Sequence, residues 1–215
     1  MQLIVLGMHR TGTSALTGLL NLMGAYVGPK KRCIGANDEN KKGFWERRDV
    51  VNLNQKTLRS CGADWYRVSG LNLDSLPDMK RFKKRAAGII EDMDRHRPWV
   101  MKDPRLCLLF PLWKEFLQTP VCVHTYRSPI ETAGSLQARN GFSINAGIAL
   151  WEKYNLDALD ASQHLPRILI HYKDLLKRPV ETVEKLYNGL SSLGVRGLKL
   201  PEHAQISSFV DSSLY

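Results

Sequence analysis

Residues 3–14 constrain the fold more than any other part of the sequence. An apolar run at residues 3–6 predicts a strand, a loop bounded by Gly7 and Gly12 follows, and a helical pattern then ends at Gly24. We call residues 7–12 the glycine loop. In this order of elements, backbone N–H groups at the helix start have no internal partners and point outward. The stretch therefore predicts a site for phosphate or sulfate.

The glycine loop has the spacing of a nucleoside-triphosphate-binding loop but lacks its lysine. Gly7 and Gly12 bracket four residues and Ser14 stands at the hydroxyl position, whereas Thr13 occupies the place of the lysine. Arg10, inside the loop, supplies a cation instead. No apolar strand ending in Asp offers a magnesium site, so ATP hydrolysis is disfavoured. An ordinary strand–helix turn with a surface arginine remains the alternative.

The rest of the chain alternates short apolar runs with longer helical patterns. The other candidate strands are residues 99–101, 121–125 and 168–171. This alternation predicts a P-loop-like, three-layer α/β/α fold with a central parallel sheet. The length of 215 residues and the absence of repeats predict a single domain, 1–215. Two segments look like additions, a loop at about 28–48 and a charged helix at about 76–97 that we expect to be solvated.

Charge and composition narrow the classes of function. The chain has 31 basic and 21 acidic residues, a net charge of +10, with the excess early in the sequence, which suits an anionic ligand. We read the basic run at 80–85 as an exposed helix face, and therefore expect no nucleic-acid partner. Four scattered cysteines predict neither a metal site nor disulfides. Without a long apolar run or a leader pattern, we expect no membrane span and a cytoplasmic protein.

A second strand–helix junction surrounds Arg127. Ser128, Pro129 and Glu131 have the spacing of an N-cap, a first helical residue and a capping box. Arg127 then lies at the carboxyl edge of the strand, where ligands of open parallel sheets bind. Ser135 is about two turns into the helix and can face the same ligand. The pair predicts a compact phosphate site, unless both are ordinary surface residues.

The two junctions resemble the nucleotide-binding motifs of sulfotransferases that use 3′-phosphoadenosine-5′-phosphosulfate (PAPS) and release 3′,5′-adenosine bisphosphate (PAP). The resemblance implies that Arg127 and Ser135 hold the 3′-phosphate. It implies that the 5′-phosphosulfate is held by Arg10, Thr11, Gly12, Thr13 and Ser14. Cytosolic members usually carry Lys in the loop, so Arg10 departs from them and agrees with the glycan and tyrosylprotein branches.

Two further segments look like parts of the same family. Residues 43–46 and 102–105 are similar to stretches of its bacterial and tyrosylprotein branches. The resemblance covers roughly residues 1–190, and the four motifs follow the order of the family. It implies an enzyme that transfers a sulfuryl group to an acceptor hydroxyl by in-line displacement.

Sulfuryl transfer needs positive groups around the departing phosphate and a base for the acceptor hydroxyl, and it requires no metal. Arg10 and Lys102 are the expected catalytic cations. Lys102 follows a predicted strand and should emerge at the same sheet edge as the glycine loop. The alternative for Lys102 is an ordinary ion pair, because Asp103 is its neighbour. We expect Asp103 to hold either Lys102 or Arg105.

Glu46 is the predicted base. Two aromatic residues precede it, so partial burial would raise the pKa of its carboxyl group, and the related tyrosylprotein enzymes use a Glu in a similar place. Glu46 could equally be a surface residue paired with one of the two arginines that follow it. His9 in the loop and His124 on a strand rank behind Glu46, because a lone strand histidine is usually a core residue.

The acceptor site is the least defined by the sequence. Its expected walls are residues 28–48, 65–66 and 139–142, since loops at the carboxyl edge of a sheet vary between substrates. The acceptor would be a hydroxyl-bearing saccharide or small molecule. Two other functions stay open, a P-loop nucleotide kinase that uses magnesium-ATP and a noncatalytic module that binds anions or nucleotides.

Overall fold

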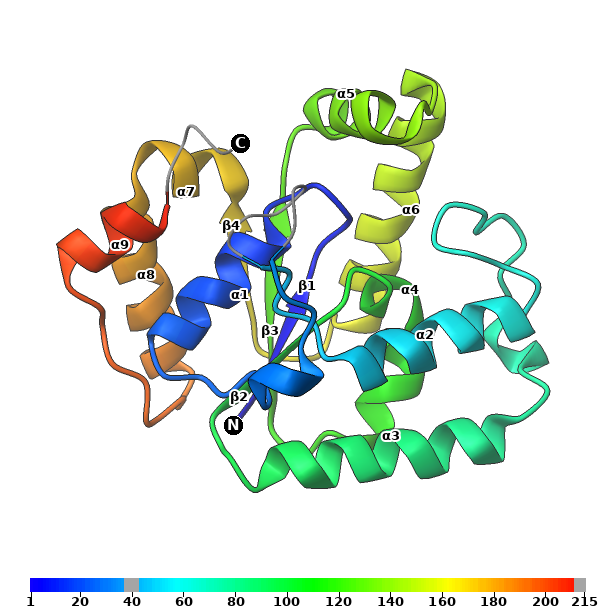
Figure 1. The fold of residues 1–215 in the computed structure, drawn as a ribbon, viewed down its shortest axis with the longest axis horizontal. Coiled ribbons are helices and arrows are strands. Elements are labelled where there is room, and N and C mark those ends of the chain that lie inside the picture. Colours follow the sequence, from blue (N-terminus) through cyan, green and yellow to red (C-terminus); the bar gives the residue numbers. More distant parts are fainter. Residues whose placement is uncertain (37–42, 211–215) are drawn as a thin grey trace.

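The computed structural model describes residues 1–36 and 43–210 and is built around a parallel sheet. The strand order is β2–β1–β3–β4 (Figure 1). The strands are β1 (Gln2–Leu6), β2 (Trp99–Lys102), β3 (Pro120–Tyr126) and β4 (Arg167–His171). The prediction of four parallel strands is confirmed.

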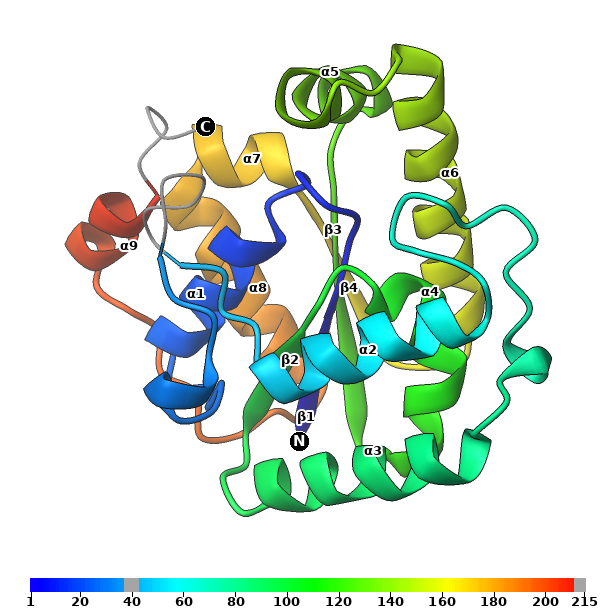
Figure 2. The ribbon, with the colours of Figure 1, turned by 45° about the vertical axis from the view of Figure 1, so that its right-hand side comes forward.

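Helices cover both faces of the sheet, which confirms the three-layer α/β/α fold (Figures 1 and 2). One layer holds α1 (Thr13–Leu22), α7 (Tyr172–Lys177), α8 (Pro179–Ser192) and α9 (His203–Phe209). The other holds α2 (Arg48–Ser60), α3 (Met79–Asp94), α4 (Leu106–Trp113) and α6 (Ile144–Ala161). Beyond the carboxyl end of β3, α5 (Pro129–Asn140) packs on α6.

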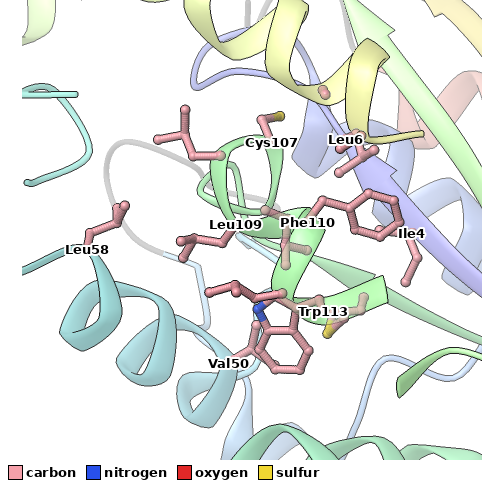
Figure 3. Packing of buried hydrophobic residues seen from close by; sticks show 14 of the residues in the cluster. Ile4, Leu6, Val50, Leu58, Cys107, Leu109, Phe110 and Trp113 are labelled. Atoms are coloured by element: carbon pink, nitrogen blue, oxygen red, sulfur yellow. The ribbon is translucent and has the colours of Figure 1, made fainter. Parts of the chain in front are cut away.

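The fully buried strand β1 divides the hydrophobic core in two. Leu3 and Val5 pack with the α1 and α8 layer, whereas Ile4 and Leu6 pack with the α4 layer because successive strand side chains point to opposite faces. Figure 3 shows Ile4 and Leu6 on the strand side of α4, whose Phe110 lies toward them. Burying each large apolar side chain contributes about 1.5–3 kcal/mol.

The charged segment at 76–97 is only partly solvated, which corrects the prediction. Within it, α3 buries a stripe at helical spacing that consists of Phe82, Ala86, Ile90 and Met93. The Asp78 side chain caps the helix by accepting a hydrogen bond from the backbone N–H of Arg81 at 3.0 Å. Charged residues lie on both sides of this apolar stripe, so the sequence of the segment is dominated by charge and the stripe is hard to recognise.

The loop predicted at 28–48 ends where α2 begins. It contains a 3-10 turn, Lys30–Arg32, and an isolated bridge joins Cys33 to Arg47. Two other 3-10 turns, Leu73–Ser75 and Lys114–Phe116, lie elsewhere in the chain. Residues 37–42 of the predicted loop lie outside the described residues.

Two helical glycines give a matched test of the packing of α5 on α6. A Cβ at Gly147 of α6 would lie 2.7 Å from the Cβ of Ala133, whereas a Cβ at Gly134 of α5 would meet open space. We expect Gly147→Ala to lower the free energy of unfolding by about 1–3 kcal/mol, because overpacking costs that much. Gly134→Ala should raise it by about 0.5–1 kcal/mol. Urea unfolding measures both, and equal shifts would contradict this packing.

Candidate active site

The glycine loop is pressed against β3 and α7. A Cβ at Gly7 would lie 2.6 Å from the carbonyl oxygen of Thr125, and one at Gly12 would overlap the ring of Tyr172. Gly12 also has a φ of 88°, in the left-handed region that favours glycine. Both glycines are therefore required by close approach, and α1 begins directly after the second of them.

Hydrogen bonds fix the loop in this position. The Thr11 hydroxyl donates to the carbonyl of Met8 at 2.8 Å, and the Thr125 hydroxyl donates to the carbonyl of Thr11 at 2.7 Å. Thr11 is fully buried, and its side chain and its carbonyl group both serve to hold the loop. Arg10 has a φ of 70°, a conformation that is costly outside glycine and gathers at functional sites.

Three predicted residues meet at the start of α1. Lys102, at the end of β2, donates from Nζ to Oε1 of Glu46 at 2.6 Å and to the hydroxyl of Ser14 at 3.1 Å. We call these three residues the Lys102 cluster. Lys102 is 2% exposed and Glu46 is 8% exposed. Glu46 is thus a buried partner of Lys102 and not a surface residue paired with the arginines that follow it.

Burial changes the ionisation of the pair formed by Lys102 and Glu46. Burial raises the pKa of the Glu46 carboxyl group above its usual range, although the positive charge of Lys102 pulls it back. Removing one partner of such a pair leaves an uncompensated buried charge, at a cost of about 3–5 kcal/mol. The pair therefore also ties the segment before α2 to the sheet.

Asp103 holds Arg105 and not Lys102. Its Oδ1 accepts from Nη1 of Arg105 at 2.9 Å, and its Oδ2 accepts from the amide of Asn54 at 2.9 Å. The Asn54 carbonyl oxygen in turn accepts from the indole N–H of Trp113 at 2.7 Å. This buried chain of bonds fixes α2 against the end of β2, next to Lys102.

A second group of predicted residues lies at the end of β3. Nε of Arg10 donates to the hydroxyl of Ser135 at 2.8 Å, and Nη1 of Arg127 donates to the carbonyl of Arg10 at 3.5 Å. We call Arg10, Arg127 and Ser135 the Arg127 cluster. Nε of Arg127 bonds to Glu131 at 2.9 Å. The structure thus brings together side chains that are up to 125 residues apart in the chain.

The capping box predicted at α5 is wrong in its bonding. Ser128 is the N-cap, but its side chain makes no capping bond. The Glu131 carboxylate pairs with Arg127, because a charged partner one turn away outweighs a neutral backbone N–H. Sequence reasoning also missed Tyr172, over whose ring the Arg127 guanidinium lies at 5.5 Å, and Trp151, which donates to the Arg127 carbonyl at 2.9 Å.

The two histidines occupy different environments. His124 is a satisfied core residue: its Nε2 lies 2.9 Å from the Ser162 hydroxyl, whose own proton goes to Ala158, and burial lowers the pKa of His124 to about 4. His9 has a buried Nε2 with no hydrogen-bond partner among the described residues. Burial and then the charge of Arg105 hold the pKa of His9 well below its usual range.

Aromatic rings gather beside His9. Its ring lies 4.6 Å from that of Trp65, and Trp65 lies 5.3 Å from Tyr66 and 5.6 Å from Phe142. Two of the three predicted acceptor walls, residues 65–66 and 139–142, are therefore neighbours. The third, 28–48, is only partly within the described residues.

Known proteins decide the family. Residues 2–192 match the model of the sulfotransferase family. The chain belongs to this family. Sulfuryl transfer is therefore its general chemistry, in agreement with the resemblance in the motifs, and the match argues against the nucleotide kinase. Among curated proteins, none matches this sulfotransferase.

Solved structures of other sulfotransferases share the P-loop-like fold. The sulfotransferase domain of the Synechococcus PCC 7002 olefin synthase has a TM-score of 0.56 at 16% identity, over 99% of this chain and 84% of that one. Sulfotransferase STF1 from Mycobacterium tuberculosis H37Rv has a TM-score of 0.56 at 13% identity, over 97% and 76%. The domain from the curacin biosynthetic pathway has a TM-score of 0.55 at 14%, over 97% and 77%.

Two features are absent from residues 1–36 and 43–210 of this sulfotransferase. No helix there is long and apolar enough to cross a membrane. No three His, Cys, Asp or Glu side chains there come together as a metal site would need.

Proposed function

We propose that this sulfotransferase moves a sulfuryl group from PAPS to an acceptor hydroxyl by in-line displacement. One observation carries the proposal: a cation–hydroxyl cluster lies on either side of Gly12, where the glycine loop meets α1. Arg10 belongs to the Arg127 cluster and Ser14, four residues later, to the Lys102 cluster. PAPS carries two separate anionic groups, and two cationic clusters fit such a donor better than a single phosphate site would.

The Lys102 cluster fits the 5′-phosphosulfate. The hydroxyl of Ser14 and the first N–H groups of α1, from Thr13 onward, face an anion at the helix start. Nζ of Lys102 is already within reach of Ser14. These groups would stabilise the negative charge that grows on the departing phosphate, which is the chief electrostatic demand of the reaction.

The Arg127 cluster fits the 3′-phosphate. Arg127 is oriented by Glu131 and by the ring of Tyr172, and the hydroxyl of Ser135 lies within reach of Arg10. Nε of Arg10 donates to Ser135, and we assign the Arg10 guanidinium to the phosphosulfate as well. Arg10 would thus join the two anionic sites, as well as act in catalysis.

We assign Glu46 as the base that takes the proton of the acceptor hydroxyl. Its carboxylate is bonded to Lys102, so it must first be released. An anion beside Ser14 competes for Nζ of Lys102 and provides that release. The raised pKa of Glu46, caused by burial, then suits proton transfer near neutral pH.

The ring group of Trp65, Tyr66 and Phe142 is the proposed acceptor wall. Aromatic faces stack on sugar rings as well as on other rings, so a carbohydrate is one candidate acceptor among hydroxyl compounds. We also propose a cytoplasmic location, because the four cysteines are free thiols and disulfides are rare in reducing compartments.

Replacing Arg127 should weaken the binding of a nucleotide that carries a 3′-phosphate more than the binding of one that lacks it. We expect Arg127→Met to weaken binding of PAP by about tenfold or more, since charge-assisted hydrogen bonds contribute about 1.5–3 kcal/mol, and to change binding of 5′-ADP by less than about threefold. Calorimetric titration measures both. Arg95→Met, at the exposed end of α3, is the control. Equal losses for the two nucleotides would remove Arg127 from the 3′-phosphate site.

Replacing Glu46 should separate binding from turnover. Glu46→Gln removes the base, so we expect turnover with the best acceptor of a hydroxyl panel to fall by about 10²–10⁴-fold. Binding of PAP should stay within about threefold, because the Lys102 and Arg127 cations remain. Lys102→Met is the comparison, and it should lower turnover and also weaken the binding of PAP. Unchanged turnover in Glu46→Gln would show that another group takes the proton.

A further inference from the structure

A groove of about 720 Å³ lies between α2 and α3. The two helices run side by side in opposite directions, and both views show them on the same side of the sheet (Figures 1 and 2). The lining shares no residue with the Lys102 cluster or the Arg127 cluster. Its volume lies within the range of small-molecule sites, about 300–1,000 Å³.

One end of the groove is electrically balanced. Arg47, which is 3% exposed, donates to Asp49 at 2.6 Å and to Asp92 at 2.9 Å. Arg32 adds a longer contact of 3.5 Å to Asp92. These contacts fix the walls of the groove relative to each other, so its shape does not depend on a ligand.

The other end carries unbalanced positive charge. It is lined by Lys56 of α2 and by Arg81, Lys84 and Arg85 of α3. Within the part of the chain that the structure describes, these four side chains make no ion pair. Like charges gathered in a concave surface repel each other and focus the field on an incoming anion. The sequence spacing of 81, 84 and 85 puts all three on one helix face.

We propose that this groove binds an anionic polysaccharide through Lys56, Arg81, Lys84 and Arg85. The inference goes beyond the proposed function, because binding at the groove requires neither the donor nor sulfuryl transfer. Sulfate or carboxylate groups of the chain would meet the four cations. Sugar hydroxyls between those groups would donate to Asp49 and Asp92 at the balanced end.

The lining favours a polysaccharide over single-stranded nucleic acids, membranes and acidic peptides. It contains no aromatic side chain, and single-stranded nucleic acids are held by base stacking on aromatic rings. Its apolar members, Leu53 and Ile89, are buried and partly buried against the core, so they form no exposed apolar face for insertion into a membrane. A contiguous acidic peptide would meet repulsion from Asp49 and Asp92.

Three polyanions of equal charge test the ligand class. The probes are a heparin-derived octasaccharide, an oligothymidylate and a polyglutamate, titrated at one salt concentration without nucleotide. We expect the octasaccharide to bind at least about tenfold more tightly than the other two. Equal or tighter binding of the oligothymidylate or the polyglutamate overturns the polysaccharide assignment. The absence of donor keeps this result independent of the proposed function.

Removing positive charges from the groove tests whether the polysaccharide binds there. Lys84→Ser/Arg85→Ser should weaken octasaccharide binding about tenfold. The control Lys80→Ser/Lys83→Ser removes the same charge from the same helix outside the groove lining and should change binding by less than about threefold. Equal losses of affinity in the two variants would indicate a general charge effect and would overturn the assignment of binding to the groove.

Filling the groove tests the location without changing charge. A Cβ at Gly88 meets no atom within 4 Å, so Gly88→Leu projects into the groove without disturbing the core. The exposed neighbour Ala87 gives the control Ala87→Leu. We expect Gly88→Leu to weaken octasaccharide binding about tenfold and Ala87→Leu to leave it within about twofold, both with cooperative thermal unfolding. Undiminished binding in Gly88→Leu overturns the proposal.

Discussion

The buried bond between Lys102 and Glu46 organises the site. It joins the end of β2 to the segment before α2, and through Ser14 it reaches the first turn of α1. Each of these elements comes from a different part of the chain, so the bonds of Lys102 hold three separate backbone segments together. A lysine buried here would be costly without its carboxylate. In the proposed function, an arriving anion would give Lys102 a second partner and would free Glu46.

The close approach of the glycine loop to β3 and α7 is the second constraint on the site. Gly7 and Gly12 let the glycine loop lie on Thr125 of β3 and Tyr172 of α7. The loop is therefore held against the same strand whose end carries Arg127. Tyr172 serves both purposes, since its ring contacts the loop at Gly12 and the guanidinium of Arg127. The fold thus sets the spacing between the two cationic clusters, which is the property that the proposed donor with two anionic groups would require.

Local patterns in the sequence predicted the four strands, α1, α3 and the start of α5, but side-chain partners depended on tertiary structure. Strands were readable because apolar runs are bounded by turn residues, and Arg127 was placed at a strand end by the helix start after it. Lys102 and Glu46 are 56 residues apart in the sequence, so no local pattern predicts the bond between them. Asn54 and Tyr172 were missed for the same reason. In α3 the dense charges hid an apolar stripe, and at α5 a charged partner displaced the expected capping bond.

We propose that the two clusters together form a metal-independent site for a 3′-phosphorylated adenine nucleotide. Calorimetric titration of the wild-type protein with PAP in the presence of EDTA, against magnesium-ATP in a parallel experiment, tests this proposal. We expect one binding event for PAP without metal and at least about tenfold weaker binding of magnesium-ATP. Tighter binding of magnesium-ATP, or no binding of PAP, would contradict it.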